Sequence, residues 1–304
     1  MNRRILLVTA YDGTGYAGFQ AQKSGVPTIE GELNRALTDL TGTETEVIGA
    51  SRTDAGVHAR CNLAVFDTQS RIPPEKFAHA LNVRLPEQIR VTRSLEMPTD
   101  FHPRHCSTVK TYEYRIYNAQ MPDPMRRLYT YFSRYRFDVE AMQRAAQDLP
   151  GEHDFRSFCS TYTSAKTTVR EVLSVDVETA SLQTGQNGRP SEDTDLLDPR
   201  RFLSDPRLST PRLSTEPASD FRKSWDGSPR EIVIRVRGKG FLYNMVRIIA
   251  GTLMEVGRGA KAPEEMAAIL AACDRRAAGP TAPACGLTLV RYEITEPGME
   301  MEFL

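Results

Sequence analysis

Residues 49–59, with the sequence GASRTDAGVHA, place an acid, an arginine and a histidine among residues too small to build a core. Asp54 follows Arg52 by two positions. A carboxylate held beside a guanidinium in a cleft can stay ionised and act as a nucleophile or a base. The same spacing also suits a weak surface ion pair, or a turn in which Asp54 caps its own backbone. The residues of this loop alone leave these interpretations open.

The elements that would position this loop occur in an order that is repeated along the chain. In the first half, strands are expected at 4–11, 45–49, 62–67 and 89–95, with helices at 28–40 and 74–82. In the second half, strands are expected at 109–117, 168–178, 231–237 and 286–293, with helices at 138–149, 241–256 and 263–272. Leaving aside the helix at 263–272, each half reads β-α-β-β-α-β, the ferredoxin-like arrangement.

This order predicts an α+β protein with two ferredoxin-like halves, whose antiparallel sheets flank a central cleft. We expect an N-terminal half over residues 1–105 and a C-terminal half over 106–304. The loop at 49–59 falls between the second and third strands of the first half. Functional residues on a surface loop held by a rigid sheet are common in enzymes.

Composition excludes several classes of protein. The chain has 304 residues and a formal net charge of zero, from 39 basic and 39 acidic residues, so charge alone neither supports nor excludes nucleic acid. No apolar run approaches the roughly 18–20 residues that a membrane helix needs. The five cysteines are odd in number and lack C-x-x-C pairs, which favours a reducing cytoplasm over a disulfide framework.

Residues 181–230 differ from the rest of the chain. They are rich in proline, serine and charge, and they contain the tandem repeat PRLST-PRLST at 206–215. Such a composition buries too little apolar surface to offset the cost of ordering. We therefore expect a low-complexity insertion that interrupts the C-terminal half.

The loop SRTDAGVHA closely resembles the catalytic loop of pseudouridine synthases, and specifically of the tRNA pseudouridine synthase A (TruA) family. The resemblance continues in family order outside 181–230, with Phe19 where tryptophan is more usual. The matching segments are YDGTGYAGFQ (11–20), TIEGELNRAL (28–37), LNVRLPEQIRV (81–91), FHPRHCSTVKTYEYRIYN (101–118), GEHDFRSFC (151–159), TTVREV (167–172), GFLYNMVRIIAGTLMEVGRG (240–259) and PACGLTLVRYE (283–293). It implies the pseudouridine synthase fold and isomerisation of uridine to pseudouridine in the tRNA anticodon stem-loop, at positions 38, 39 and 40.

The resemblance also implies roles for individual residues. Asp54 matches the catalytic aspartate that acts as nucleophile, and Arg247 matches the basic residue that pairs with it, which would lower the pKa of the acid. Periodicity alone would make Arg247 a solvent-facing helix residue. Arg52 matches the arginine that helps to flip the base or hold its phosphate. Tyr112 matches the tyrosine that stacks on the base, whereas Tyr114 reads as an aromatic core position.

Five further residues are candidate RNA contacts, because imidazole and cationic side chains can hold phosphates without reading sequence. They are His58, Arg60, His102, Arg104 and Lys110. The segment HPRHC at 102–106 lacks a second ligand cluster, so no metal is expected. The family works without a cofactor, generally as a homodimer with tRNA as its partner, and we expect no membrane association.

The reaction route and the activity itself have alternatives. Asp54 can attack C1′ or remove a proton from C2′, and both routes need the ionised carboxylate. The chain could be a non-catalytic tRNA-binding chaperone, although the intact Asp54–Tyr112–Arg247 set argues against it. It could also modify another RNA site. A retaining glycoside hydrolase ranks last, because that chemistry normally needs a second carboxylate.

Overall fold

The computed structural model describes residues 2–22, 25–161, 165–180, 182 and 228–304. The predicted insertion at 181–230 therefore lies almost entirely outside the described residues. The N-terminal half contains β1 (Arg3–Tyr11), α1 (Ile29–Thr41), β2 (Ile48–Gly49), β3 (His58–Thr68), α2 (Phe77–Asn82) and β4 (Ile89–Met97). The C-terminal half contains β5 (Thr108–Asn118), β6 (Tyr131–Ser133), α3 (Val139–Ala146), β7 (Gly151–Asp154), β8 (Val169–Ala180), β9 (Arg230–Gly238), α4 (Met245–Gly257), α5 (Glu265–Ala271), β10 (Leu287–Ile294) and β11 (Met301–Phe303).

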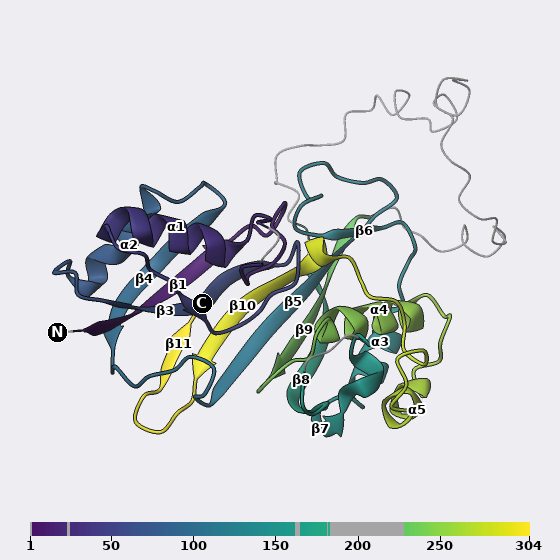
Figure 1. Cartoon of the computed structure of the whole chain (residues 1–304). Coiled ribbons are helices and arrows are strands. Elements are labelled where there is room, and N and C mark those ends of the chain that lie inside the picture. The colour runs from purple at the N-terminus through teal and green to yellow at the C-terminus, as the bar shows by residue number, and fades with distance from the viewer. Residues whose placement is uncertain (1, 23–24, 162–164, 181, 183–227) are drawn as a thin grey trace, which may run out of the picture.

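The two halves share one continuous mixed sheet (Figure 1), so the α+β class is confirmed but the prediction of two sheets is wrong. The main strand order is β4-β1-β3-β10-β5-β9-β8-β7, and β2 pairs with β3. Within each half the predicted strands keep one order: β4-β1-β3-β2 in the first and β10-β5-β9-β8 in the second. The halves meet where β10 runs parallel to β3, with Thr288 opposite His58 and Leu289 opposite Ala59.

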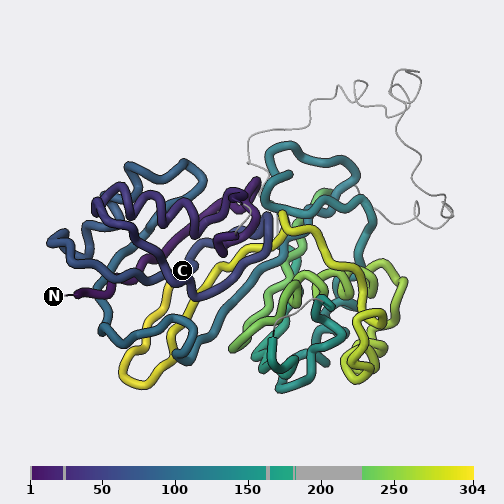
Figure 2. Tube along the Cα trace, viewed as in Figure 1, coloured from purple at the N-terminus to yellow at the C-terminus, as the bar shows by residue number. Residues whose placement is uncertain are grey.

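The strand β10 is therefore central in space although it comes late in the sequence. Figure 2 shows its yellow trace lying between the purple and blue N-terminal half and the teal and green C-terminal half. Its other edge pairs antiparallel with β5, where Leu289 lies opposite Tyr112. This strand holds the loop at 50–57, which precedes β3, at one end of a surface whose floor is β5.

The helix α1 forms where the sequence predicts it. Thr28 caps its first turn by accepting a hydrogen bond from the Gly31 amide at 3.2 Å. Gly42 ends it in a left-handed conformation, with φ of 71°. Its apolar face is mostly buried, with Ile29, Leu33 and Leu37 at most 1% exposed and Leu40 partly exposed. In Figure 1, α1 and α2 lie over the N-terminal strands.

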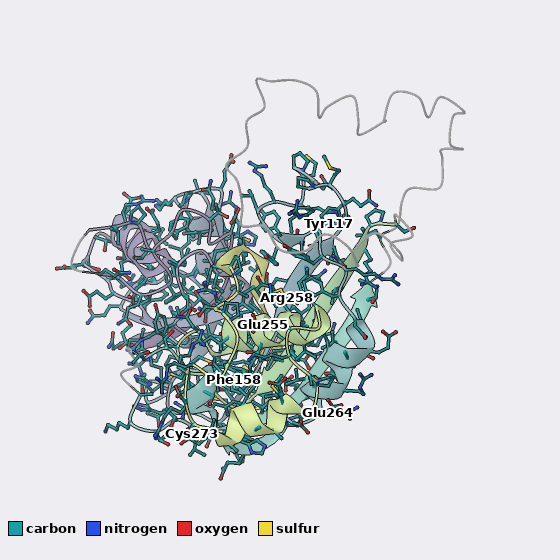
Figure 3. All side chains as sticks on the ribbon, turned by 90° about the vertical axis from the view of Figure 1, so that its right-hand side faces the viewer. Tyr117, Phe158, Glu255, Arg258, Glu264 and Cys273 are labelled. Carbon is teal, nitrogen blue, oxygen red and sulfur yellow. The ribbon has the colours of Figure 1, made fainter. Side chains whose placement is uncertain are left out.

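The helix α4 begins four residues later than the predicted 241. Asn244, directly before it, has a φ of 61°, which a helix cannot accommodate. Residues 239–244 are therefore a non-helical segment that leads from β9 into α4. In Figure 3 this half faces the viewer, and Glu255 and Arg258 mark the C-terminal end of α4. Within the described residues, no helix has the length and apolarity to cross a membrane.

Candidate active site

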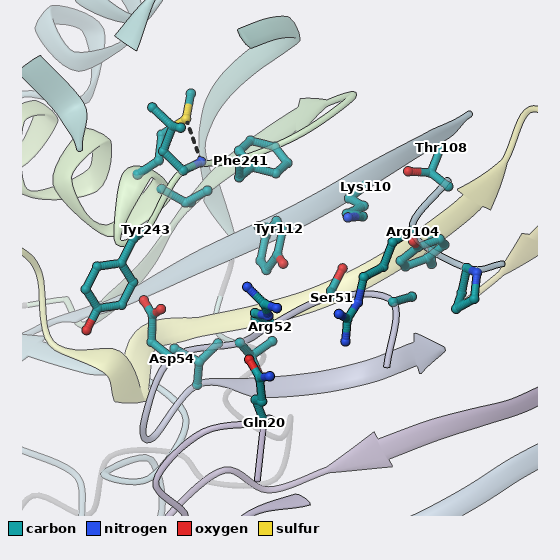
Figure 4. A pocket seen from close by; sticks show the side chains of 18 of the residues that line it. Gln20, Ser51, Arg52, Asp54, Arg104, Thr108, Lys110, Tyr112, Phe241 and Tyr243 are labelled. Atoms are coloured by element: carbon teal, nitrogen blue, oxygen red, sulfur yellow. Dashed lines mark hydrogen bonds between the residues drawn. The ribbon is translucent and has the colours of Figure 1, made fainter. Parts of the chain in front are cut away.

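A cleft of about 1400 Å³ opens over the middle of the sheet (Figure 4). Its walls are the loop at 50–57, the segment at 239–246 and the segment at 103–108, and β5 forms its floor. Asp54 and Tyr243 lie at one end of the view, Tyr112 is in the middle, and Lys110 and Arg104 are at the other end. Segments from both halves of the chain therefore build one cleft.

The loop that carries Asp54 is held by the backbone and by its neighbours. The Val57 amide donates to the Asp54 carbonyl at 3.1 Å, and Gly56 adopts a φ of 77° that favours glycine. The Thr53 hydroxyl lies 2.7 Å from the phenol oxygen of buried Tyr11. A main-chain bond closes this turn, which leaves the carboxylate of Asp54 directed into the cleft.

Arg247 brings its guanidinium to this carboxylate. Nη1 of Arg247 lies 3.5 Å from Oδ2 of Asp54, and the two side chains are 17% and 16% exposed. Two closer hydrogen bonds fix the guanidinium: Nε donates to the Ala282 carbonyl at 2.7 Å, and Nη1 donates to Oδ1 of Asn244 at 2.8 Å. Arg247 is therefore not the solvent-facing residue that periodicity alone would favour.

Burial decides the ionisation of Asp54. Removal from water raises the pKa of its carboxyl above the ordinary value, and the opposing influence of Arg247 is smaller. The sequence led us to expect that the arginine would lower this pKa. The contact of 3.5 Å is long for a charge-assisted hydrogen bond, and a half-enclosed carboxylate loses much of its hydration. The cleft thus holds a carboxylate that is less solvated and more basic than a surface aspartate.

Tyr112 forms part of the floor, and its side chain is packed. It is 7% exposed, and its ring meets that of Phe241 edge to face at 5.2 Å between centroids. Burial raises the pKa of Tyr112, so its hydroxyl stays protonated. Tyr114 is fully buried, and its hydroxyl donates to the Pro283 carbonyl at 3.0 Å. Its surroundings are those of a core residue.

The cleft is strongly cationic although the whole chain is neutral. Among the described residues that line it, Asp54 is the single acid and five side chains are cationic: Arg52, Arg104, Lys110, Arg170 and Lys239. Such a local excess of positive charge attracts a polyanion. Arg52 is exposed at the rim, and Nε of Arg104 donates to the Gly49 carbonyl at 2.6 Å. Burial lowers the pKa of Lys110 to about 8.

The three other candidate RNA contacts do not line the cleft. His58 is buried, with a side chain 4% exposed, and its Nδ1 lies 3.2 Å from a carboxylate oxygen of Asp12. The Gly13 amide donates to the same nitrogen at 3.1 Å, and burial lowers the pKa of the imidazole. Arg60 is exposed on β3, and His102 stacks on His105 at 3.9 Å between centroids.

Several lining residues were not singled out from the sequence. They include Gln20, Arg170, Lys239, Phe241, Tyr243 and Asn244. The signal for Phe241, Tyr243 and Asn244 was present, because all three lie in the segment GFLYNMVRI that carries the family resemblance. Helical periodicity assigned these three residues to the predicted helix 241–256, so they were not considered as cleft residues. Over the described part of the chain, no three His, Cys, Asp or Glu side chains gather as a metal centre would require.

Comparisons with known proteins all find similarity to tRNA pseudouridine synthases. The family model for tRNA pseudouridine synthases matches residues 7–105 and 145–293. The tRNA pseudouridine synthase A of Brevibacillus brevis is 42% identical over 287 residues, which cover 94% of this chain and 98% of that protein. The namesake enzyme of Halalkalibacterium halodurans is 39% identical over 299 residues, covering 98% and 95%. That of Moorella thermoacetica is 40% identical over 290 residues, covering 95% and 98%.

Proposed function

Because this chain belongs to the tRNA pseudouridine synthase family, we propose that the cleft around Asp54 isomerises uridine to pseudouridine in the tRNA anticodon stem-loop. The observation that carries this proposal is the placement of one partly buried carboxylate, paired with Arg247, in a cleft whose other charged lining residues are all cations. The cations suit the phosphate backbone of RNA, and the carboxylate suits chemistry at a sugar carbon.

The chemistry begins with a uridine that has left its stack, because C1′ is not reachable inside a paired stem. Cleavage of the glycosidic bond leaves its electron pair on N1 of uracil and positive character at C1′. In the first route, an oxygen of Asp54 attacks C1′ as N1 departs, and an ester forms. Uracil then rotates and C5 attacks C1′, while the ester bond breaks and returns its electron pair to the Asp54 carboxylate. C5 then loses its proton to solvent, and N1 gains one.

In the second route, the Asp54 carboxylate removes the proton from C2′ while the bond to N1 breaks, which leaves a double bond between C1′ and C2′. The rotated uracil then adds through C5 to C1′, and the Asp54 carboxyl returns the proton to C2′. C5 finally loses its own proton to solvent, and N1 gains one. Both routes give the same isomer without a cofactor, and both use the raised basicity of Asp54. We keep both routes as alternatives.

Four further side chains are assigned by their places in the cleft. Tyr112 stacks on the uracil, because a packed aromatic face tolerates rotation of the base. Arg52 lies exposed on the loop of Asp54, where it can fill the gap left by the flipped base or hold a phosphate. Arg104 and Lys110 contact the RNA backbone at the other end of the cleft. The homodimer implied by the family resemblance stays a prediction, which sedimentation of the protein alone and with tRNA would test.

Tritium release tests the proposal. With tRNA carrying [5-³H]uridine, the wild type should release tritium, because C5 exchanges its hydrogen for the bond to C1′. Asp54→Ala should release none while still binding tRNA. Asp39→Ala, which removes an exposed acid of α1 outside the cleft, should behave as the wild type. A wild type that binds tRNA without releasing tritium would overturn the proposal and favour a tRNA-binding chaperone.

A further inference from the structure

Asn244 has a backbone conformation that is unusual for its residue type and position. Its φ of 61° and ψ of 7° place it in the left-handed region directly before α4. Among the described residues, Cys273 is the other non-glycine residue with positive φ. Such a conformation costs free energy, and it persists where the surrounding structure requires it. Asparagine tolerates it better than most residues, although glycine would adopt it without cost.

The side chain of Asn244 explains why asparagine, and not glycine, occupies this left-handed position. Its Oδ1 accepts the hydrogen bond from Nη1 of Arg247 at 2.8 Å, and its Nδ2 donates to the Ser160 hydroxyl at 2.7 Å. Ser160 thus orients the amide of Asn244, and the amide in turn binds Arg247. Ser160 holds the preceding residue as well, because its amide donates to the Tyr243 carbonyl at 3.2 Å. The segment before α4 is therefore anchored on both its main chain and its side chain.

The Nη1 atom of Arg247 serves two partners at unequal distances. Asn244 is the closer at 2.8 Å, and Asp54 lies at 3.5 Å. The Ala282 carbonyl fixes Nε of the same guanidinium. Together these two short bonds hold the guanidinium where Nη1 faces the carboxylate. The geometry points to Asn244 as a positioning residue that sets the distance between Arg247 and Asp54.

The consequence concerns the protonation of Asp54. Arg247 is the cation that opposes the effect of burial on the pKa of this carboxyl. Without the amide of Asn244, the guanidinium has fewer constraints and spends less time near the carboxylate, so the pKa of Asp54 rises further. Both routes need the ionised form, so activity should then require a higher pH. This inference rests on the proposed function for its kinetic part.

The test compares Asn244→Gly with Cys273→Gly. Both variants place glycine at a left-handed position, but Cys273 lies beside α5, away from the cleft lining (Figure 3). We expect Asn244→Gly to lower kcat by about tenfold, the loss typical of one hydrogen bond to a charged group. The acidic limb of its kcat profile should move to higher pH, and its Kd for tRNA should stay within about twofold. Cys273→Gly should change none of these quantities.

Ser160→Ala provides a graded case, because it removes the anchor of the Asn244 amide but keeps the acceptor for Arg247. It should shift the acidic limb in the same direction by a smaller amount. An Asn244→Gly variant with an unmoved acidic limb would overturn the inference, even with a reduced kcat, because a purely structural role would leave the pH profile unchanged.

A titration separates failure of this inference from failure of the proposed function. The ¹³C resonance of the Asp54 carboxyl, identified by its loss in Asp54→Asn, can be followed against pH without any substrate. Its midpoint should be higher in Asn244→Gly than in the wild type. Absence of turnover in the wild type would refute the isomerase and leave this comparison intact. Equal midpoints would refute the positioning role alone.

Discussion

Nη1 of Arg247 lies 3.5 Å from Oδ2 of Asp54, although 193 residues separate the two in the sequence. The contact joins a loop of the N-terminal half to a helix of the C-terminal half. It is accompanied by a raised pKa of the aspartate, because burial of the carboxyl outweighs the nearby charge. Burial therefore makes the carboxylate more basic and also destabilises the folded protein when the carboxylate is ionised. The first two predictions follow from these two effects.

Asp54→Asn should stabilise the folded protein at neutral pH. A carboxyl whose pKa is higher in the folded than in the unfolded state contributes stability below the unfolded pKa, and that contribution is lost as pH rises through the folded pKa. Above the folded pKa the wild type carries this penalty, whereas the amide does not. We expect a Tm about 1–3 °C above the wild type at pH 7, with a smaller difference near pH 4. A difference that grows toward acid would contradict the raised pKa.

Arg247→Lys should impair catalysis although it keeps the positive charge. A lysine ammonium cannot reproduce the fixed fork that contacts Ala282, Asn244 and Asp54 together. We expect kcat to fall by about 10²-fold and its acidic limb to move to higher pH, measured by single-turnover tritium release. Arg258→Lys, at the exposed end of α4, is the matched control and should leave both quantities unchanged. An acidic limb that stays in place would mean that Arg247 has no influence on Asp54.

Substitutions of Tyr112 should separate its ring from its hydroxyl. Tyr112→Phe keeps the aromatic face and the edge-to-face contact with Phe241, whereas Tyr112→Leu keeps only apolar bulk. We expect Tyr112→Phe to bind tRNA within about twofold of the wild type, and Tyr112→Leu to bind about tenfold more weakly, because stacking on a base is lost. The remaining change in kcat of Tyr112→Phe then measures any proton transfer through the hydroxyl. Equal affinities of the two variants would exclude stacking.

Lys110→Met should weaken tRNA binding and reduce its salt dependence. The slope of log K against log salt should fall by about one, as for the loss of a single phosphate contact. The wild type should also lose affinity as pH rises above about 8, where the ammonium of Lys110 deprotonates, and the variant should not. Lys76→Met, outside the cleft lining, serves as the control. An unchanged slope would show that Lys110 does not contact an RNA phosphate.

His58→Gln should lower stability and leave the salt dependence of tRNA binding unchanged. The imidazole is buried against Asp12 and the Gly13 amide, so its loss disturbs the packing next to the loop that carries Asp54. Because its folded pKa is lowered, the neutral ring contributes stability at pH values above the unfolded pKa, and this contribution is lost as pH falls through the folded pKa. The difference in Tm should therefore be largest near neutral pH. A reduced slope of log K for tRNA binding against log salt would instead show that His58 contacts a phosphate.

Local patterns predicted the elements of the fold well. Alternating and helical periodicities located four strands of each half, two helices of the first and three of the second, because each follows from a few neighbouring residues. The strand predicted at 45–49 is shorter in the structure, where β2 spans only Ile48–Gly49. In the part of the chain that the structure describes, three short strands were missed: β6, β7 and β11, each of three or four residues. Segments of that length carry too few side chains to establish a period. The early start predicted for α4 failed because Asn244 breaks a helix that its apolar neighbours suggest.

Relationships between distant residues could not be read in this way. No local pattern signals that β10 pairs with β3, since that pairing joins residues 288 and 58. The family resemblance, and not periodicity, brought Arg247 to Asp54. The direction of the Asp54 pKa also depends on enclosure by both halves, which the sequence does not display. The division of the chain at residue 105 stays a prediction.

The central position of β10 has a consequence for biosynthesis. Chains grow from the N-terminus, so Asp54 and its loop leave the ribosome long before residues 287–294 can be inserted between β3 and β5. During that interval the edge of β3 that later receives β10 is open, and an open strand edge can pair with other chains. The His58–Ala59 stretch of β3, which pairs with β10 in the folded protein, therefore lacks this partner until almost the whole chain has been translated.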